Sequence, residues 1–359
     1  MQLRETFSGS YLPDDVDFLL KPIEIAMTPV DQKEELIQSG KKHYSDMLSQ
    51  EPAPTQWHLD LFHRALEQGA ERLAKEVTQL AVALAERVGN EPVVLVSLVR
   101  AGVPLGVMLH QALRDMGRTS FHYGISIIRD RGIDGVALNI IEKQHGTSGI
   151  VFVDGWTGKG AITEELIRTL KGRQGYPEQP HLVVLADPCG SSWLAAGADD
   201  WLIPFGIMGA PVSGLISRSV WSTEGLHGCM VCEHLSDYEC SRMLVDTVSR
   251  FRRKLSLLSL EPLNWNTESA KALWQISRDV IAYLVNQFKV DNVNRIKPGI
   301  AEATRALLRR VPQHVLVRSI HDPDVALLVG LAREKGIIVT EMGETLGQYR
   351  AVTIIKKVL

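Results

Sequence analysis

The sequence predicts an α/β fold, in which a mostly parallel, doubly wound sheet is followed by a small C-terminal α/β sandwich. Continuous apolar runs such as Val93–Leu98 and Leu182–Ala186 are typical of strands buried on both faces. Segments with apolar residues at helical spacing separate these runs, which indicates crossover helices covering a parallel sheet. The same alternation starts again after residue 293, over a length that suits a small second domain.

We divide the chain into four segments. An N-terminal extension covers 1–55, the first α/β domain 56–262, a helical linker 263–292 and the C-terminal module 293–359. In the first domain we expect strands over 93–98, 121–128, 149–153, 182–186 and 201–204. We expect one or two helices over 57–88, with a break near Gly69, and helices over 107–116, 163–170 and 246–260. After a long helix over 269–288, we expect helices over 299–310 and 323–335 and strands over 314–318, 337–340 and 350–355.

Composition restricts the class of protein. The 359 residues are 45% hydrophobic and 23% charged, which is typical of a soluble globular chain. No apolar run reaches the ~18 residues that a bilayer span requires, and the first fifteen residues lack an apolar signal core. We therefore expect a cytoplasmic protein without a membrane partner. Four cysteines are too few for a disulfide scaffold.

Charge is unevenly distributed along the chain. The net charge is −3, yet residues 293–359 hold eleven Lys/Arg and six Asp/Glu, so this segment carries +5 and the remainder −8. A basic segment on an acidic body favours an anionic partner for that segment. The alternative is that these charges form solvated helix faces.

A glycine-rich loop follows the strand expected over 149–153. The strand ends at Asp154, and Thr157 and Lys159 add a hydroxyl and a positive charge before a helix begins. Backbone N–H groups at a helix N-terminus form an anion site, and glycines let the backbone approach a phosphate. The spacing excludes a Walker loop, which needs four residues between its first Gly and the Gly-Lys pair. The glycines are Gly155, Gly158 and Gly160; an ordinary strand-to-helix turn is the alternative.

Two further loops follow earlier strands. The first contains Ser97, Arg100, Ala101 and Gly102, and leads from a buried strand into a helix. The second, after the strand expected over 121–128, contains Arg129 and Arg131. A plain connection with a surface arginine and a solvated hairpin are the respective alternatives.

The segment VFVDGWTGKG, together with the two earlier loops in the same order, resembles the phosphoribosyltransferase family over roughly residues 90–205. The resemblance implies a sheet of the type I phosphoribosyltransferase kind, and a ribose-phosphate substrate, phosphoribosyl pyrophosphate, with bound Mg²⁺. It also implies roles for the three loops. Asp154 contacts the ribose, residues 157–160 hold the 5′-phosphate, residues 97–102 meet the pyrophosphate, and Arg129 and Arg131 belong to a closing loop. This chain has one acid where the family usually has two.

More narrowly, FSGSYLPDDVDFLLKP, VRAG and DGWTGKG are similar to phosphoribosyltransferase-like proteins of bacterial tellurite-resistance and stress operons. That family carries a C-terminal pelota-like module and is also labelled as stress-induced cysteine proteases. The resemblance implies transfer of a ribose phosphate to a nitrogenous base. A non-catalytic nucleotide sensor coupled to RNA and a cysteine protease are the alternatives. We also expect a homo-oligomer.

A cysteine cluster follows the first domain's last strand. Cys229 and Cys232 are spaced as a Cys-x-x-Cys pair, with His234 and Cys240 nearby. Zinc ligation is one interpretation, but no second pair exists and buried cysteines commonly act as small apolar residues, so we expect no zinc. A protease nucleophile requires an activated thiol beside a positioned histidine.

The C-terminal segments IKPGIAEATRALLRR, HVLVRS and DPDVALLVGLAREKGI resemble the pelota and ribosomal-protein type of RNA-binding fold. The resemblance implies that structured RNA is the partner, and we expect residues 293–359 to fold alone. The expected phosphate contacts are Arg295, Lys297, Arg305, Arg309 and Arg310. A docking domain with a basic face is the alternative, and the lack of an aromatic stacking pair argues against a single-strand platform.

Overall fold

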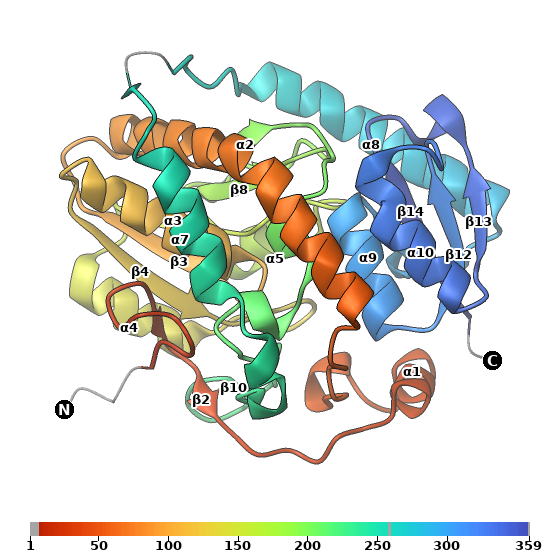
Figure 1. Cartoon of the computed structure of the whole chain (residues 1–359). Helices are drawn as coiled ribbons and strands as arrows, with labels where there is room; N and C mark the ends of the chain where they lie inside the picture. Colours follow the sequence, from red (N-terminus) through yellow and green to blue (C-terminus); the bar gives the residue numbers. More distant parts are fainter. Residues whose placement is uncertain (1–6, 258–259, 358–359) are drawn as a thin grey trace.

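The computed structural model describes residues 7–257 and 260–357, and six parallel strands form its central sheet (Figure 1). The sheet order is β1-β4-β3-β7-β8-β9, and every neighbouring pair in it is parallel. The strands are β1 (Asp17–Phe18), β3 (Val93–Leu98), β4 (Ser120–Ile125), β7 (Ile150–Val153), β8 (Leu182–Ala186) and β9 (Leu194–Gly197). The predicted α/β class with a mostly parallel sheet is confirmed.

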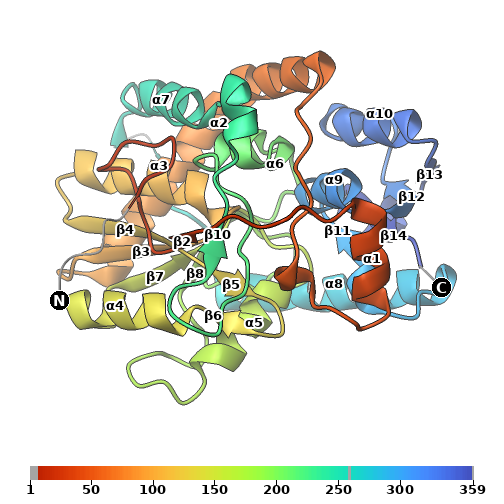
Figure 2. The same ribbon diagram turned by 90° about the horizontal axis from the view of Figure 1, so that it is seen from below.

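Helices cover both faces of this sheet (Figure 2). On one face lie α2 (Gln56–Val88), α3 (Gly102–Asp115) and α7 (Ser241–Arg252), and on the other α4 (Gly135–His145) and α5 (Ala161–Leu170). The remaining elements of this domain are α1 (Val30–Gln38), α6 (Pro204–Ile207), the parallel pair β2 (Lys21–Pro22) and β10 (Gly228–Cys229), and the hairpin β5 (Ile127–Ile128) and β6 (Gly132–Ile133). The short helices α1 and α4 escaped prediction.

Two predictions for this domain were wrong. Helix α2 runs through Gly69 without a break, because that glycine lets the helix pack closely against Trp201 and Pro204. Residues 201–204 are not a strand; β9 occupies the sheet edge instead, and α6 begins at Pro204, a residue favoured at the first helical position. The helix expected over 246–260 is α7, which begins at Ser241 and ends at Arg252; residues 258–259 of the expected range lie outside the described residues.

The C-terminal domain is a four-stranded mixed sheet in the order β11-β14-β12-β13. Its strands are β11 (Ile296–Pro298), β12 (Pro312–Val317), β13 (Ile338–Glu341) and β14 (Ala351–Ile355), and its helices are α8 (Thr267–Gln287), α9 (Ile300–Arg309) and α10 (Ala326–Glu334). The predicted alternation of helices and strands is confirmed here to within a few residues. Among the described residues, no helix is both long and apolar enough to cross a bilayer.

Helix α8 packs as part of this C-terminal domain. Its Val280, Ile281 and Leu284 share a buried cluster with Ile296 and Leu316 of the sheet. The domain boundary expected at residue 293 therefore runs through a common core, which ties the expected linker 263–292 to the module.

The C-terminal domain docks directly over the glycine-rich loop of the first domain. The Asp200 carboxylate accepts hydrogen bonds from the backbone N–H groups of Ile300 (2.9 Å) and Arg350 (2.8 Å). The Tyr349 hydroxyl donates to the Gly158 carbonyl at 2.7 Å. Buried polar contacts of this kind fix how the two domains lie relative to each other.

Candidate functional site

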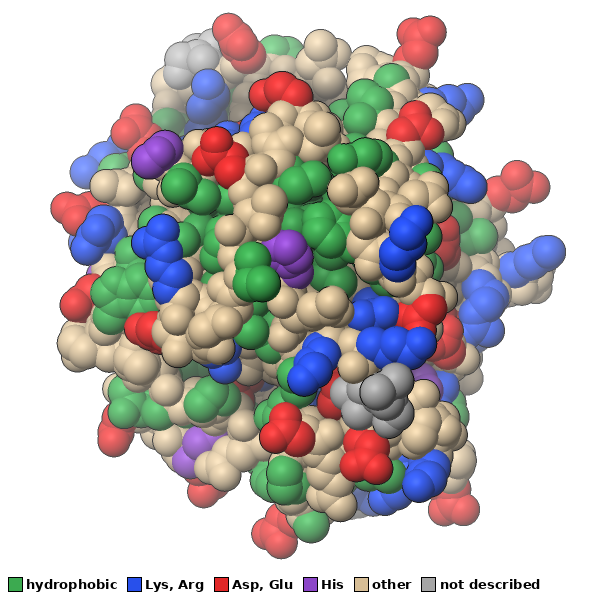
Figure 3. Space-filling model, turned by 90° about the vertical axis from the view of Figure 1, so that its right-hand side faces the viewer, with side chains coloured by type: hydrophobic (Ala, Val, Ile, Leu, Met, Phe, Trp, Pro, Cys, Tyr) green, Lys and Arg blue, Asp and Glu red, His purple; other side chains and the backbone are tan. Residues whose placement is uncertain are grey.

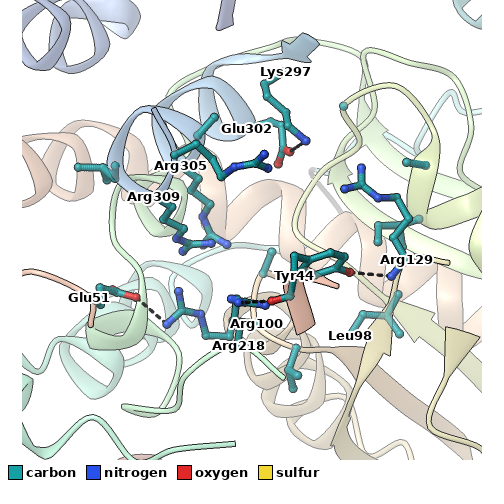
Figure 4. A pocket seen from close by; sticks show the side chains of 18 of the residues that line it. Tyr44, Glu51, Leu98, Arg100, Arg129, Arg218, Lys297, Glu302, Arg305 and Arg309 are labelled. Atoms are coloured by element: carbon teal, nitrogen blue, oxygen red, sulfur yellow. Dashed lines mark hydrogen bonds and ion pairs between the residues drawn. The ribbon is translucent and has the colours of Figure 1, made fainter. Parts of the chain in front are cut away.

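A cavity of about 610 Å³, here called the chamber, lies between the two domains. The residues after β3 and β7 form one wall, α9 and β11 form the opposite wall, and α1 with residues 44–52 closes a side. Ligands of open α/β sheets bind beyond the carboxyl ends of the strands, which is where the chamber lies. Figure 4 shows arginines from both walls pointing into this space.

Positive charge dominates the chamber. Ten lysines and arginines line it against three acids, a formal balance of +7. The cations are Lys33, Arg100, Arg129, Lys159, Arg218, Lys297, Arg305, Arg309, Arg310 and Lys335, and the acids are Glu51, Asp154 and Glu302. So many like charges in one enclosed space repel one another unless an anion is present.

Asp154 lies at the chamber end of β7, as its position after the strand predicts. Its carboxylate accepts a hydrogen bond from the N–H of Gly155 at 2.8 Å. Burial raises the pKa of Asp154 to about 7, against the opposing effects of this hydrogen bond and of Arg305. At neutral pH both the protonated and the charged form of this carboxyl are therefore populated.

The side chains of the glycine-rich loop contact protein groups. Thr157 donates its hydroxyl to Asp187, and the Lys159 ammonium donates to the carbonyls of Val293 (2.6 Å) and Ile296 (2.9 Å). Gly160 has a φ of +85° and lies against the ring of Trp274 on α8. This loop thus serves as the docking surface for the C-terminal domain, a role that its sequence did not suggest.

The loop after β3 divides between core and chamber. Ser97 is fully buried, with its hydroxyl bonded to the Gly102 carbonyl and to His122. Gly102 lies too close to the Val153 carbonyl for any side chain, since an added Cβ would stand 2.0 Å from that oxygen. Ala101 and Arg100 line the chamber. The Arg100 guanidinium forms an ion pair with Glu51 at 2.8 Å.

Arg129 and Arg131, expected to act together, lie apart. Arg129 lines the chamber, and its backbone N–H donates to the Tyr44 hydroxyl at 2.8 Å. Arg131 pairs with Asp46 and stacks over the ring of Trp221, outside the chamber lining. The hairpin alternative, in which this segment is a β-turn of β5 and β6, describes its backbone correctly.

Four of the five cations expected to contact RNA face the chamber. Arg295 is the exception, and its guanidinium bonds to Asp291, to Gln313 and to the Ile355 carbonyl. The other four are Lys297, Arg305, Arg309 and Arg310. An RNA on the outer surface of the docked domain would not reach these four side chains, and their contact with RNA stays a prediction.

The sequence reasoning missed the contribution of the N-terminal extension. Lys33 on α1, Tyr44 and Glu51 all line the chamber, as does Arg218 from the segment before β10. Residues 23–55, which follow the FSGSYLPDDVDFLLKP segment, have a weak periodicity and no motif, so no local signal identified Lys33, Tyr44 or Glu51.

All four cysteines are free and buried. Within the described chain, Cys232 is the one cysteine in the chamber lining. Burial raises the pKa of its thiol to about 11, with Arg100 acting in the opposite direction. His227 bonds to Ser126, and His234 bonds through Nε2 to the Glu51 carbonyl at 2.9 Å.

Among the described residues, no group of three His, Cys, Asp or Glu side chains is placed to hold a metal ion. The expected absence of zinc and the expected Mg²⁺ both stay predictions.

Fold and site together define a two-domain α/β protein with a cationic chamber at its domain interface. A sequence profile described as tellurite-like stress resistance cysteine protease StiP matches residues 9–249, and one described as PELOTA RNA binding domain matches residues 275–357. The chain is 48% identical over 369 aligned positions to the protein named cysteine protease StiP of Acinetobacter baylyi, covering 99% of this chain and 96% of that protein. The chain belongs to the StiP family.

These findings correct the predicted function. The profile and the relative both carry the cysteine protease name, which the sequence reasoning held as an alternative, so the assignment to phosphoribosyl transfer was wrong. Among solved structures, the chain is similar to hypoxanthine phosphoribosyltransferase of Trypanosoma cruzi, with 16% sequence identity and a TM-score of 0.28. The similarity covers 36% of this chain and 77% of that one. The HGPRT-ase of Leishmania tarentolae has 15% sequence identity to this chain and a TM-score of 0.26, and the similarity covers 37% of this chain and 80% of that one. Such TM-scores carry no argument about activity.

Proposed function

We propose that the chain is a stress-response cysteine protease in which the Cys232 thiol is the nucleophile. The observation that carries the proposal is the presence of Cys232 in the chamber wall of a protein 48% identical to one named cysteine protease StiP. Cys189, Cys229 and Cys240 are buried outside the chamber lining, where a peptide has no access.

The thiol requires a base before it can attack. With a pKa near 11, Cys232 is protonated at neutral pH, and a thiol is a far weaker nucleophile than a thiolate. Cys232 precedes the 3₁₀ turn 233–238, and His234 lies in the first part of that turn. We propose that substrate binding brings the His234 ring to the thiol, since no described imidazole bonds to a cysteine sulfur in the free protein.

The chemical steps follow from these two groups. His234 takes the thiol proton while sulfur bonds to the scissile carbonyl carbon, and the proton then passes to the departing amine. Water hydrolyses the resulting thioester and restores the thiol. The cationic lining favours substrates with acidic side chains beside the scissile bond.

Peptide cleavage by the full chain tests this proposal. A peptide library with acidic residues, analysed by mass spectrometry, should be cleaved by the native protein and left intact by Cys232→Ser and by His234→Gln. Cys240→Ser is the matched control, because its serine can keep the bond that the thiol makes to the Tyr238 carbonyl. Cleavage that persists in Cys232→Ser would remove this thiol from the reaction.

A second proposal concerns the C-terminal domain, which we propose binds structured RNA through its outer surface. The match of residues 275–357 to a pelota RNA-binding profile supports it. Figure 3 views this side of the molecule, where Lys and Arg side chains lie among Asp and Glu side chains. Lys356 and Lys357 are exposed after β14, and Arg333 is exposed at the end of α10.

Salt dependence measures how RNA is held. Each phosphate contact releases counterions, so Lys356→Gln should weaken binding of a structured RNA and flatten the plot of log K against log salt by about one unit. The double change Arg309→Ala with Arg310→Ala tests the expectation from the sequence that these two arginines contact RNA phosphates. If only this pair weakens binding, RNA must reach the chamber face, and the outer-surface proposal fails.

A further inference from the structure

We infer that a side pocket next to the chamber, with Arg309 of α9 in its lining, binds an acidic side chain of the peptide substrate. This side pocket is a second cavity, of about 40 Å³, and Glu51, Arg305 and Arg309 line both it and the chamber. The inference rests on the proposed function, because it assigns a substrate subsite beside the proposed nucleophile. It makes the C-terminal domain the part of the protein that selects what the first domain cleaves.

The side pocket has the size and lining of a site for one short side chain. At about 10–15 Å³ for each water molecule, its volume of about 40 Å³ is room for roughly three, which is about the space of a carboxyl group. Binding pockets commonly combine apolar walls with a few polar groups that fix the ligand. The apolar walls, which suit the methylene groups of a side chain, include Pro54, Met208, Pro211 and Leu308.

Arg309 is a cation of this pocket without a protein partner. Its guanidinium has no hydrogen bond or ion pair from any described residue. The neighbouring Arg305, in contrast, donates to the carbonyls of Phe205 and Met208, both at 3.3 Å. Taking a charged group away from water without a replacement partner is costly, so the Arg309 side chain is suited to binding an anion.

The acid in the pocket lining is already engaged elsewhere. The Glu51 carboxylate pairs with Arg100 at 2.8 Å and accepts from the backbone N–H of Ala210 at 2.8 Å. Arg309 therefore needs an acceptor from outside the protein. A guanidinium offers pairs of parallel N–H donors that match the two oxygens of a carboxylate. Asp and Glu are the genetically encoded side chains that carry a negative charge at neutral pH, so a peptide supplies this acceptor with one of them.

The side pocket also lies beside the proposed reacting groups. The Glu51 carbonyl accepts from Nε2 of His234 at 2.9 Å, so a residue of the pocket lining also holds the proposed base. Arg100 and Glu51 are the charged groups that act on the Cys232 thiol, and both act on Arg309 as well. In Figure 4, Arg309 points from α9 toward Glu51 and Arg100. An acidic side chain bound by Arg309 thus belongs to a residue close to the scissile bond.

Peptide binding by the full chain carrying Cys232→Ser tests the inference without cleavage. Calorimetry compares acetyl-Ala-Glu-Ala-amide with the same peptide containing Gln in place of Glu. We expect the Glu peptide to bind about ten- to a hundred-fold more tightly, the ratio expected for charge-assisted hydrogen bonds. Adding Arg309→Gln should bring this ratio close to one. The Gln peptide with a free C-terminal carboxylate should bind more weakly than the Glu peptide, which distinguishes a side chain from a chain end.

Two variants make the result specific. Arg333→Gln removes an exposed arginine from the same domain and should keep the ratio, and Arg309→Lys, which keeps the charge without the fork, should give an intermediate one. Arg309→Gln should melt at an equal or higher temperature than its parent, because it removes a charge that has no partner, so a lost ratio does not come from unfolding.

The inference is overturned if the Glu and Gln peptides bind equally, if neither binds, if Arg309→Gln keeps the ratio, or if the free C-terminal carboxylate binds as tightly as the Glu side chain. Cleavage is measured separately. Glu-selective binding by a chain that cleaves no peptide contradicts the proposed protease and supports the subsite. Cleavage that depends on Cys232 but keeps the same preference for acidic peptides in Arg309→Gln contradicts the subsite alone.

Discussion

Two consecutive arginines, the last residue of α9 and the one that follows it, lie in opposite environments in the chamber. On the side of the chamber that α1 closes, here called the rim, Arg310 forms two hydrogen bonds of 2.5 and 2.7 Å with Glu34 of α1. In the interior, Arg309 has no described partner, and burial followed by repulsion from Arg100 lowers its pKa well below the ordinary value. The difference shows that a cation lining the chamber either joins two segments through an ion pair or lies without a described partner among like charges.

The largest effect should come from breaking the rim pair. Arg310→Gln removes the arginine partner of the Glu34 carboxylate, whose side chain is 2% exposed, and leaves it the hydrogen bond from the Gln38 amide at 2.6 Å. Removing one member of a buried ion pair costs about 3–4 kcal/mol, because the remaining charge has lost its water and one neutral donor does not replace the guanidinium. Chemical denaturation followed by circular dichroism measures this loss.

A double change serves as the control for that experiment. Glu34→Gln combined with Arg310→Gln removes both charges, and should recover much of the stability lost in the single variant. If Arg310→Gln is no less stable than Arg309→Gln, the distinction between rim and interior fails.

A smaller loss of stability should distinguish the glycine-rich loop, which contacts the C-terminal domain, from a turn that contacts nothing. Gly160 and Gly172 have similar positive φ values, +85° and +77°, so alanine at either position is strained by about 1 kcal/mol. At Gly160 the new methyl would also lie 2.4 Å from the Trp274 ring of the C-terminal domain, whereas nothing lies within 4 Å at Gly172. Displacing Trp274 should add about 1 kcal/mol to the loss for Gly160→Ala.

Thermal melting of the two alanine variants compares them directly. Equal losses of stability would mean that the contact between the glycine-rich loop and the C-terminal domain does not stabilise the protein.

Local patterns predicted the four inner strands of the central sheet but neither edge strand, β1 or β9, and they predicted no long-range contact. Val93–Leu98 and Leu182–Ala186 were predicted to the residue, because a strand buried on both faces shows as an unbroken apolar run. The acid at the end of β7 was also placed correctly, since strand ends position ligand-facing side chains. In contrast, Glu34 and Arg310 are 276 residues apart, and nothing local marks either as a partner of the other.

The sequence could not indicate which way the basic side chains at α9 point. A helix with Arg305, Arg309 and Arg310 has the same sequence pattern whether its cations face water, RNA or an enclosed space. The excess of +5 after residue 293 therefore favoured an anionic partner without locating it. Only the docking of the C-terminal domain over the first domain turns these side chains inward.

The last predicted effect is a pH dependence that should isolate Lys33, a buried lysine on the side of the chamber that α1 closes. Burial, followed by repulsion from Arg218, Arg310 and Arg309, lowers its pKa from an ordinary 10.5 to about 7. Between these values the unfolded chain binds more protons than the folded one, so stability should rise with pH, by at most about 1.4 kcal/mol per unit for one group. The useful window is pH 7 to 8.5.

Other groups change the stability outside this window. The raised pKa of Asp154, about 7, makes stability fall with rising pH below the window, and the buried thiols make it fall above the window. Lys297, whose pKa burial lowers to about 8, adds a contribution of the same sign that a change at Lys33 leaves in place. Lys33→Met should therefore reduce the slope of unfolding free energy against pH in this window, while the exposed control Lys171→Met should keep it. Parallel lines for the native chain and Lys33→Met would mean that Lys33 keeps an ordinary pKa, and that the positive field of the chamber does not reach its rim.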